Sequence, residues 1–218
     1  MKKYIIVGLG NFGATLAEEL FRKGNDVVAI DKDEVIINRI APNVSQAIVA
    51  DGSDRGLLER FGASECDAAV VSTGEDVTAS VLTLMALMDL GVRRVYVKVN
   101  SVEHSRVMAR LGATETIFPE KESAQNLITR LEDEGIVSYV HLGGGFSLQE
   151  MVVPPSWQGS NLRTLKLPIR YKISVIGIHD VLSDELVVPP DPDRPLNVSD
   201  ALIVAGSPEA LGRAAKVQ

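Results

Sequence analysis

The feature that most restricts the fold is a glycine-rich turn that follows the first apolar run of the chain. Residues 3–7 lead directly into a G-x-G-x-x-G turn formed by Gly8, Gly10 and Gly13, and residues 12–22 then have the spacing of a helix. In a dinucleotide-binding unit the first glycine permits the tight turn, the second lets the backbone approach the phosphates, and the third lets the helix pack against the strand. Free amides at the start of such a helix attract phosphate. The turn therefore predicts a dinucleotide-binding unit, with a glycine turn that binds nothing as the alternative.

An acidic residue follows the second apolar run at the position that this interpretation requires. Residues 27–30 form that run, and Asp31 comes directly after it. A carboxylate there accepts hydrogen bonds from a ribose diol and repels a 2′-phosphate, so NADP is disfavoured. The neighbouring Lys32 would weaken that repulsion, or would simply be solvated.

The first 120 residues alternate short β-branched runs with amphipathic segments, which is typical of a parallel sheet with helices on both faces. The predicted strands are residues 3–7, 27–30, 47–49, 68–72, 94–99 and 115–118. The predicted helices are residues 12–22, 34–40, 55–61, 76–89 and 102–111. We therefore expect a Rossmann-like, doubly wound, six-stranded parallel sheet.

A second, smaller unit is predicted after this sheet. A helix over residues 120–134 is expected to end at Gly135, and Gly143-Gly144-Gly145 between two apolar runs indicates a hairpin. The remaining expected elements are strands at residues 136–142, 146–153, 173–178, 185–188 and 201–204, a proline-rich loop at 189–195 and a helix at 208–215. The sequence thus predicts a nucleotide-binding domain at residues 1–135 and a small α+β domain at residues 136–218.

Composition excludes several classes of protein. The 218 residues carry 22 basic and 29 acidic side chains, a formal charge of −7, whereas nucleic-acid binding needs a basic face. Cys66 is the one cysteine, which excludes a disulfide framework and a thiolate zinc site. No apolar stretch approaches the ~18–20 residues that span a bilayer, and no signal-peptide pattern is present. We therefore expect a cytoplasmic protein with no nucleic-acid partner.

A set of short motifs occurs in a specific order along nearly the whole chain. They are Ile6-Val7-Gly8-Leu9-Gly10-Asn11-Phe12-Gly13, Asp31, Ala50-Asp51-Gly52-Ser53-Asp54, Ser72-Thr73-Gly74-Glu75-Asp76 and Phe118-Pro119-Glu120, followed by residues 162–178 and 200–206. In this order the chain resembles the RCK/TrkA family, the cytoplasmic regulatory subunits of bacterial potassium uptake systems. The resemblance implies a nucleotide-sensing gating-ring subunit that controls K⁺ flux and is not an enzyme.

The resemblance also implies roles for individual residues. Gly8, Gly10 and Gly13 would hold the phosphates of an adenine nucleotide, which is NAD(H), ADP, ATP or AMP, and Asp31 would hold its ribose. Asp51 would contact the adenine edge, or it would cap the helix that begins near Ser53 or Asp54. The other nucleotide-binding residues expected on this basis are Asn11, Phe12, Lys32, Thr73, Gly74 and Lys98.

Two positions depart from the family pattern or leave alternatives open. Many members that distinguish ATP from ADP have arginine where this chain has Asn11, and a short neutral side chain cannot supply the charged fork that a γ-phosphate favours. In the second domain, Arg170-Tyr171 and residues 173–178 lie where some relatives bind cyclic di-AMP, although Lys172 replaces the usual glycine. An ordinary strand with its preceding loop also accounts for these residues.

Glu120 matches a family acid at a dimer interface, where a divalent cation can bridge it to the nucleotide's terminal phosphates. A glutamate in the first turn of a helix is also favourable without any metal, by roughly 0.3–1 kcal/mol. Two copies would pair through the helix around residues 122–131, and further association would build a ring, an octamer in the family. The ring would lie at the inner face of the membrane, against a separate membrane-spanning K⁺-translocating subunit.

An NAD(H)-dependent oxidoreductase is the competing interpretation, because dehydrogenases use the same fold. Hydride transfer needs an acid or base beside the nicotinamide. The three histidines are His104, in a predicted helix, and His141 and His179, in or near the second domain. No Tyr-x-x-x-Lys pair is present, and a single lysine such as Lys98 also suits pairing with a phosphate. The sequence thus favours a binding protein over a catalyst.

Overall fold

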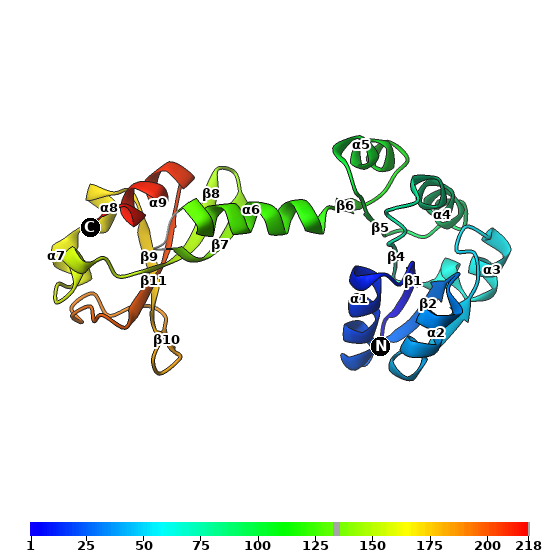
Figure 1. The fold of residues 1–218 in the computed structure, drawn as a ribbon, viewed down its shortest axis with the longest axis horizontal. Helices are drawn as coiled ribbons and strands as arrows, with labels where there is room; N and C mark the ends of the chain where they lie inside the picture. The colour runs from blue at the N-terminus through cyan, green and yellow to red at the C-terminus, as the bar shows by residue number, and fades with distance from the viewer. Residues whose placement is uncertain (133–135, 218) are drawn as a thin grey trace. The chain divides into compact units, whose positions relative to one another are not determined.

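The structure is a computed structural model that describes residues 1–132 and 136–217. Its contacts divide the chain into two compact units, Met1–Glu120 and Lys121–Gln218 (Figure 1). The boundary expected between residues 135 and 136 adjoins residues 133–135, and these, with the helix end expected at Gly135, lie outside the described residues. The position of that boundary therefore stays a prediction.

The first unit is built on a parallel sheet of six strands in the order β3-β2-β1-β4-β5-β6. The strands are β1 (Lys3–Val7), β2 (Asp26–Asp31), β3 (Gln46–Val49), β4 (Ala68–Val71), β5 (Val95–Lys98) and β6 (Glu115–Ile117). The predicted Rossmann-like sheet is confirmed, and each strand begins and ends within two residues of its expected bounds.

Helices cover both faces of this sheet. They are α1 (Asn11–Arg22), α2 (Glu34–Ile40), α3 (Arg55–Arg60), α4 (Val77–Asp89) and α5 (Val102–Arg110), with short 3₁₀ helices at Ala41–Asn43 and Ala63–Glu65. Successive side chains of a strand point to opposite faces. In β1, Ile5 and Val7 enter the core under α3, α4 and α5, while Ile6 enters the core under α1 and α2. The central strand thus anchors two cores and holds the glycine turn between them.

Helix α4 is unusual because it is apolar on its outer face as well as its inner one. Residues 77–88 contain no charged side chain, and a helix that is apolar all round normally lies buried. Leu84 and Leu87 are buried, but Leu82, Met85 and Met88 are each 39–49% exposed. Val107 on the adjacent α5 and Leu111 at its C-cap are also exposed, as are Val77 and Val102 at the starts of the two helices. This surface is called the α4–α5 face below.

The second unit contains helix α6 (Pro119–Glu132), which begins at the end of the first unit, and an antiparallel sheet in the order β10-β9-β11-β8-β7. The strands are β7 (Ile136–Gly143), β8 (Phe146–Val152), β9 (Ser174–Asp180), β10 (Glu185–Val187) and β11 (Asp200–Gly206), and helix α9 (Pro208–Ala215) follows them. The hairpin at Gly143-Gly144-Gly145 joins β7 to β8, as predicted. The small α+β domain is confirmed.

Two one-turn helices of the second unit were not predicted from the sequence. They are α7 (Leu162–Leu165) and α8 (Leu167–Arg170), and Lys166 joins them in the left-handed conformation with a φ of 49°. Asn161 caps α7 by accepting a hydrogen bond from the Thr164 amide at 2.9 Å. Four residues are too few for a helical period to be recognised in the sequence. The pair Asn161 and Thr164, three positions apart, was the local signal for the start of α7. No helix in the described ranges is both long and apolar enough to cross a bilayer.

A histidine joins three segments of the second unit. His179 on β9 contacts Glu150 of β8 through Nδ1 at 2.6 Å and Asp184 of the β9–β10 turn through Nε2 at 3.1 Å. Both ring nitrogens can donate only when the imidazole is protonated. Hydrogen bonds to Glu150, and then to Asp184, raise the pKa of His179.

The His179 contacts are therefore expected to stabilise the second unit in a pH-dependent way. Because the pKa in the folded state is raised, the stabilisation is full below the unfolded-state pKa and is lost as the pH rises through the folded-state pKa. In His179→Gln the free energy of unfolding should fall most at about pH 5.5 and least at about pH 8.5. Urea unfolding followed by the fluorescence of Trp157, the one tryptophan, measures this unit. An equal loss at both pH values would contradict the expectation.

Candidate nucleotide-binding site

The three glycines of the G-x-G-x-x-G turn have different surroundings. Gly8 has a φ of +88°, and a Cβ there would lie 2.7 Å from the backbone carbonyl of Ser72. A Cβ on Gly13 would collide with the carbonyl oxygen of Gly8, so close helix–strand packing requires glycine. A Cβ on Gly10 would meet no atom within 4 Å. Gly8 and Gly13 are thus required by the fold itself, whereas the space beside Gly10 is left open.

Helix α1 differs from the other helices that begin at this edge of the sheet. Asp33, Asp54, Asp76 and Ser101 cap α2, α3, α4 and α5 with their side chains. The N-cap of α1 is Gly10, which has no side chain to offer, and the first helical bond runs from the Ala14 amide to its carbonyl. The amides of residues 11–13 precede that bond, and such unsatisfied amides with the helix dipole favour an anion.

Asp31 ties the glycine turn to the end of β2. Its Oδ2 accepts a hydrogen bond from the Leu9 amide at 2.6 Å, and its Oδ1 accepts one from the Asp33 amide at 2.9 Å. A carboxylate oxygen has capacity for a further hydrogen bond. The carboxylate is therefore fixed in place beside the turn and can still accept from a ligand hydroxyl.

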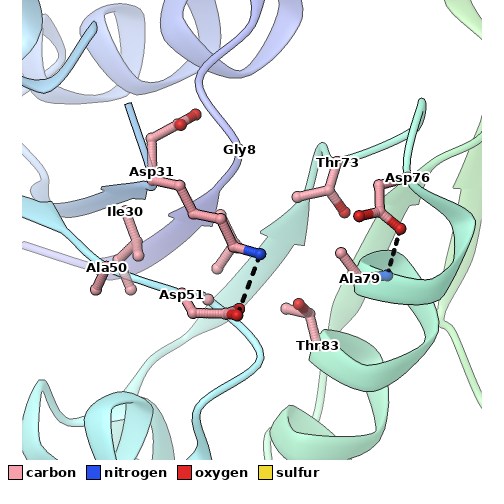
Figure 2. A pocket seen from close by; sticks show the side chains of 12 residues that line it. Gly8, Ile30, Asp31, Ala50, Asp51, Thr73, Asp76, Ala79 and Thr83 are labelled. Atoms are coloured by element: carbon pink, nitrogen blue, oxygen red, sulfur yellow. Dashed lines mark hydrogen bonds and ion pairs between the residues drawn. The ribbon is translucent and has the colours of Figure 1, made fainter. Parts of the chain in front are cut away.

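A cleft of about 130 Å³ opens beside this turn, where the strand order changes direction between β1 and β4. Ligands of doubly wound sheets bind at such a switch point, outside the carboxyl ends of the strands. Figure 2 shows Gly8, Asp31 and Asp51 on one side and Thr73, Asp76 and Thr83 on the other. The lining residues are Val7, Gly8, Ile30, Asp31, Lys32, Ala50, Asp51, Gly52, Thr73, Asp76, Ala79 and Thr83.

Asp51 lies at the mouth of the cleft and is paired with Lys32. Its Oδ1 accepts from the amide and the hydroxyl of Ser53 at 2.9 and 2.7 Å. Its Oδ2 is 3.1 Å from the Lys32 Nζ, and Figure 2 draws this ion pair as a dashed line. The Ser53 amide, the Ser53 hydroxyl and Lys32 lower the pKa of Asp51. The alternative that Asp51 caps a helix is wrong, because Asp54 caps α3 by accepting from the Leu57 amide.

At the far side of the cleft, a turn after β4 contacts the end of β5. The buried Oγ1 of Thr73 has no hydrogen-bond partner among the residues described. A Cβ on Gly74 would lie 3.3 Å from the carbonyl oxygen of Lys98. The Lys98 ammonium pairs with the Glu120 carboxylate at 2.7 Å, and this hydrogen bond lowers the pKa of Glu120. Within the described ranges, no group of three or more His, Cys, Asp or Glu side chains is arranged to hold a metal.

The structure gathers some of the expected site residues in the cleft and places others outside its lining. Gly8, Asp31, Lys32, Asp51 and Thr73 line the cleft. The other expected residues are not among those that line it: Gly10, Asn11, Phe12 and Gly13 lie in the glycine turn and at the start of α1, Gly74 follows β4, Lys98 ends β5, and Glu120 lies in the first turn of α6.

Seven lining residues were not predicted as site residues, namely Val7, Ile30, Ala50, Gly52, Asp76, Ala79 and Thr83. A Cβ on Gly52 would collide with Val7 of β1, so this backbone passes directly over the strand. Thr83 is 1% exposed on α4, and it was recognisable as a polar side chain within an uncharged apolar helix. Asp76 was recognisable as a helix cap but not as part of the cleft wall.

The cyclic di-AMP prediction involves residues that the second unit uses for packing. The Tyr171 ring lies 5.4 Å from the Trp157 ring, and Ile173 and Ile178 are 1% exposed. A separate groove of about 340 Å³ is lined by Leu162, Arg163, Leu167, Pro168, Val175, Pro190 and Pro192. The site at Arg170-Tyr171 stays a prediction.

Comparison with protein families assigns both parts of the chain. Residues 4–119, more than half of the sequence, match the TrkA-N domain, and residues 148–217 match the TrkA-C domain. The chain belongs to the TrkA family.

This TrkA-family chain is similar in sequence to potassium uptake proteins along almost its whole length. It is 30% identical to Ktr system potassium uptake protein C of Bacillus subtilis (strain 168) over 212 residues, which are 97% of this chain and 95% of the relative. It is also 30% identical to Ktr system potassium uptake protein A of Vibrio alginolyticus over 215 residues, 99% of this chain and 97% of the relative.

Solved structures with the same fold include the GsuK RCK domain and the GsuK channel bound to NAD. Their TM-scores are 0.53 and 0.54, each at 21% identity over 97% of this chain. This TrkA-family chain spans 45% and 37% of those two longer chains. This likeness shows that the chain has the fold of an RCK domain.

Proposed function

We propose that this chain is a nucleotide-sensing regulatory subunit of a potassium transporter or channel. The observation that carries the proposal is the cleft at the switch point, where an open glycine turn and the free amides of α1 adjoin Asp31. These groups match the phosphates and the ribose of an adenine nucleotide. The relatives that match along almost the whole chain are named as potassium uptake proteins, which connects such a site with K⁺ transport.

The ligand is an adenine nucleotide, namely NAD(H), ADP, ATP or AMP. Asp31 accepts from the ribose diol, Asp51 lies where the adenine edge would be read, and the amides of residues 11–13 face the phosphates. Asp31 carries a negative charge at the position of a 2′-phosphate, which disfavours NADP. Any divalent cation at Glu120 would take its other ligands from the nucleotide or from a second copy of the chain.

The oxidoreductase alternative is not supported by a specific observation. The ionisable groups that line the cleft are Asp31, Lys32, Asp51 and Asp76, and three of them are engaged in the backbone contacts of turns and caps. Burial raises the pKa of the Cys66 thiol to about 11, so it is not an activated nucleophile at neutral pH. We propose that the chain binds nucleotide without transforming it.

Binding would control K⁺ flux by shifting the population of ring conformations. A ligand moves such an equilibrium only by its differential affinity for the two states. A tenfold preference supplies only ~1.4 kcal/mol per site, so several coupled sites are needed to move a gate. The proposed assembly is a ring, an octamer as the family resemblance implies, at the cytoplasmic face of the membrane against a membrane-spanning K⁺-translocating subunit.

Two exposed apolar surfaces support self-association. Leu127, Ile128 and Leu131 of α6 are 45–73% exposed, in the segment through which two copies are proposed to pair. A ring built from dimers needs a second contact surface on each copy, and the α4–α5 face provides one. Exposed apolar patches of this kind commonly mark protein–protein contacts.

The full chain is therefore expected to sediment as an assembly well above the 23.5 kDa of one copy. Met85→Glu should reduce the size of the assembly, because it places a charge in the middle of the α4–α5 face, where burial without a partner is costly. Val35→Glu is the matched control, because Val35 is a single exposed valine on α2. Analytical ultracentrifugation measures both variants, and a strictly monomeric wild-type chain would contradict ring formation.

The experiment that tests the proposed function has two parts. Calorimetric titration of nucleotide-free full chain with AMP, ADP, ATP, NAD⁺ and NADH should give saturable binding of at least one of them. Potassium flux into liposomes that contain a K⁺-translocating membrane subunit should then depend on the added chain and change with that nucleotide. Binding without any effect on flux would remove the regulatory role, and turnover of NADH with a substrate would restore the oxidoreductase interpretation.

Asn11 provides a prediction about phosphate number. It is exposed at the first position of α1, where a longer cationic side chain can reach the terminal phosphate. Asn11→Arg should raise the affinity for ATP relative to ADP by about tenfold, the value of one charge-assisted hydrogen bond. Asn11→Gln is the uncharged control of intermediate length. If the ATP/ADP ratio of dissociation constants did not change, position 11 would not face the terminal phosphate.

A further inference from the structure

Lys98 lies between the turn that follows β4 and the start of α6. It is the last residue of β5, and only 22% of its side chain is exposed. Its Nζ lies 2.7 Å from the Glu120 Oε1, and Glu120 is in the first turn of α6, with 61% of its side chain exposed. A poorly hydrated ammonium of this kind is thus neutralised by an acid that water can readily solvate.

A short series of contacts connects Lys98 to the glycine turn. A Cβ on Gly8 would lie 3.0 Å from the Thr73 Cγ2, and a Cβ on Gly74 would lie 3.3 Å from the Lys98 carbonyl oxygen and 3.9 Å from its Cδ. The glycine turn, the turn after β4 and the stem of Lys98 therefore pack against one another. The turn after β4 is therefore what separates Lys98 from phosphates held at the start of α1, because β4 lies between β1 and β5 in the sheet.

The ammonium can change partners without being left unpaired. An ammonium has three donors, and Glu120 is the partner that the structure gives it. A nucleotide phosphate carries charge at least equal to that of a carboxylate and also accepts charge-assisted hydrogen bonds. When a phosphate occupies the cleft, Lys98 has a competing acceptor, and an exposed Glu120 loses little by returning to water.

We propose that Lys98 is shared between Glu120 and the phosphates of the bound nucleotide, so that it reports occupancy of the cleft to the first turn of α6. Glu120 is the last residue of the first unit, and residues 121–132 of the same helix belong to the second unit. Release of Glu120 would therefore free the start of the helix that continues into the second unit. The inference rests on the proposed function, because it requires a phosphate-bearing ligand in the cleft.

A double-mutant cycle with two ligands tests the sharing of Lys98. Full-length wild type, Glu120→Gln, Lys98→Met and the double variant are titrated with ADP and with adenosine, in EDTA so that no divalent cation bridges Glu120 to phosphate. Glu120→Gln should tighten ADP binding by about threefold or more, because the competitor for Lys98 is weakened. Lys98→Met should weaken ADP binding by about tenfold, the value of a charge-assisted hydrogen bond.

If Lys98 is shared, two further results are expected from this double-mutant cycle. In the Lys98→Met background, the gain from Glu120→Gln should disappear. Adenosine, which has no phosphate, should bind all four proteins equally, and its binding also establishes that each variant is folded. Glu115→Gln is the control for net charge, because Glu115 lies at the amino end of β6, whereas Lys98 lies at the carboxyl end of the neighbouring β5; it should change neither affinity.

The outcomes separate this inference from the proposed function. If wild type bound neither ADP nor adenosine, both would be overturned. If wild type bound ADP but Glu120→Gln gave an equal gain in both backgrounds, Glu120 would act only through its own charge, and the sharing of Lys98 would be overturned while the function stood. If Lys98→Met weakened the binding of adenosine as much as that of ADP, the sharing of Lys98 would likewise be overturned while the function stood.

Hydrogen exchange tests whether occupancy of the cleft changes the first turn of α6, which is called the report to α6 below. In wild type, addition of ADP should speed amide exchange in the peptide that contains Glu120, because the first turn of α6 loses its contact with Lys98. In Lys98→Met, ADP should leave this exchange unchanged. Unaltered exchange in ADP-saturated wild type would overturn the report to α6.

Discussion

Replacement of Gly10 by alanine is expected to abolish nucleotide binding while leaving the fold nearly as stable as before. The added methyl group meets no protein atom within 4 Å, and the backbone at Gly10, with a φ of −60°, suits alanine. The methyl group instead occupies the open space through which, in the proposed site, phosphate would reach the amides of α1. Loss of those charge-assisted hydrogen bonds should weaken binding at least about 100-fold, whereas alanine at an N-cap costs less than about 1 kcal/mol.

Gly13→Ala is the informative comparison, because the same chemical change meets a filled space. Its methyl group would collide with the Gly8 carbonyl oxygen, and overpacking of this kind costs roughly 1–3 kcal/mol or more. Thermal unfolding with and without saturating ADP measures both variants. If Gly10→Ala lowered the melting temperature as much as Gly13→Ala, or bound ADP normally, the space beside Gly10 would not be the phosphate site.

Asp31→Ala is expected to have the second large effect. The variant removes the proposed acceptor for the ribose diol, and it also leaves the Leu9 amide without the partner it has at 2.6 Å. Leu9 is buried, and an unsatisfied buried amide costs about 1–3 kcal/mol. Nucleotide affinity should fall at least about 100-fold, since both ribose hydrogen bonds and the shape of the phosphate turn are lost.

The control for this variant is Asp33→Ala, two residues away on the same segment. Asp33 caps α2 by accepting from the Val35 amide at 2.8 Å, so its loss should cost about 1 kcal/mol of stability without an effect on affinity. Calorimetry with ADP and denaturant unfolding measure the two quantities separately. Unchanged affinity in Asp31→Ala would remove Asp31 from the binding site.

Much of the first unit was predictable because its local signals and its tertiary packing agree. The alternation of Ile5, Ile6 and Val7 between two cores follows from the period of a strand, and Gly8 and Gly13 are required by collisions that any side chain would cause. The order of the six strands follows from right-handed crossovers and a glycine turn on the first strand. These constraints leave few alternatives.

The parts that were missed depend on which side chains approach one another across the fold. Asp51 and Asp54 both have the sequence surroundings of a helix cap, and the structure decides for Asp54 because the Leu57 amide lies 3.2 Å from it. Thr83 faces the cleft from the second turn of α4, and no local pattern reveals a wall made by a helix that follows a different strand. The pairing of Lys98 with Glu120 likewise joins residues that are 22 positions apart.

The position of β1 has a consequence for how the protein acquires its ligand during synthesis. Of the six strands of this sheet, the central strand β1 leaves the ribosome before the others, and its partner β4 is made only after more than 60 further residues. Until then the glycine turn lacks Ser72 and Thr73, against which Gly8 packs. Nascent chains that end before β4 should therefore fail to retain nucleotide, and loading must follow the long-range closure of the sheet, the slow step in folds of this topology.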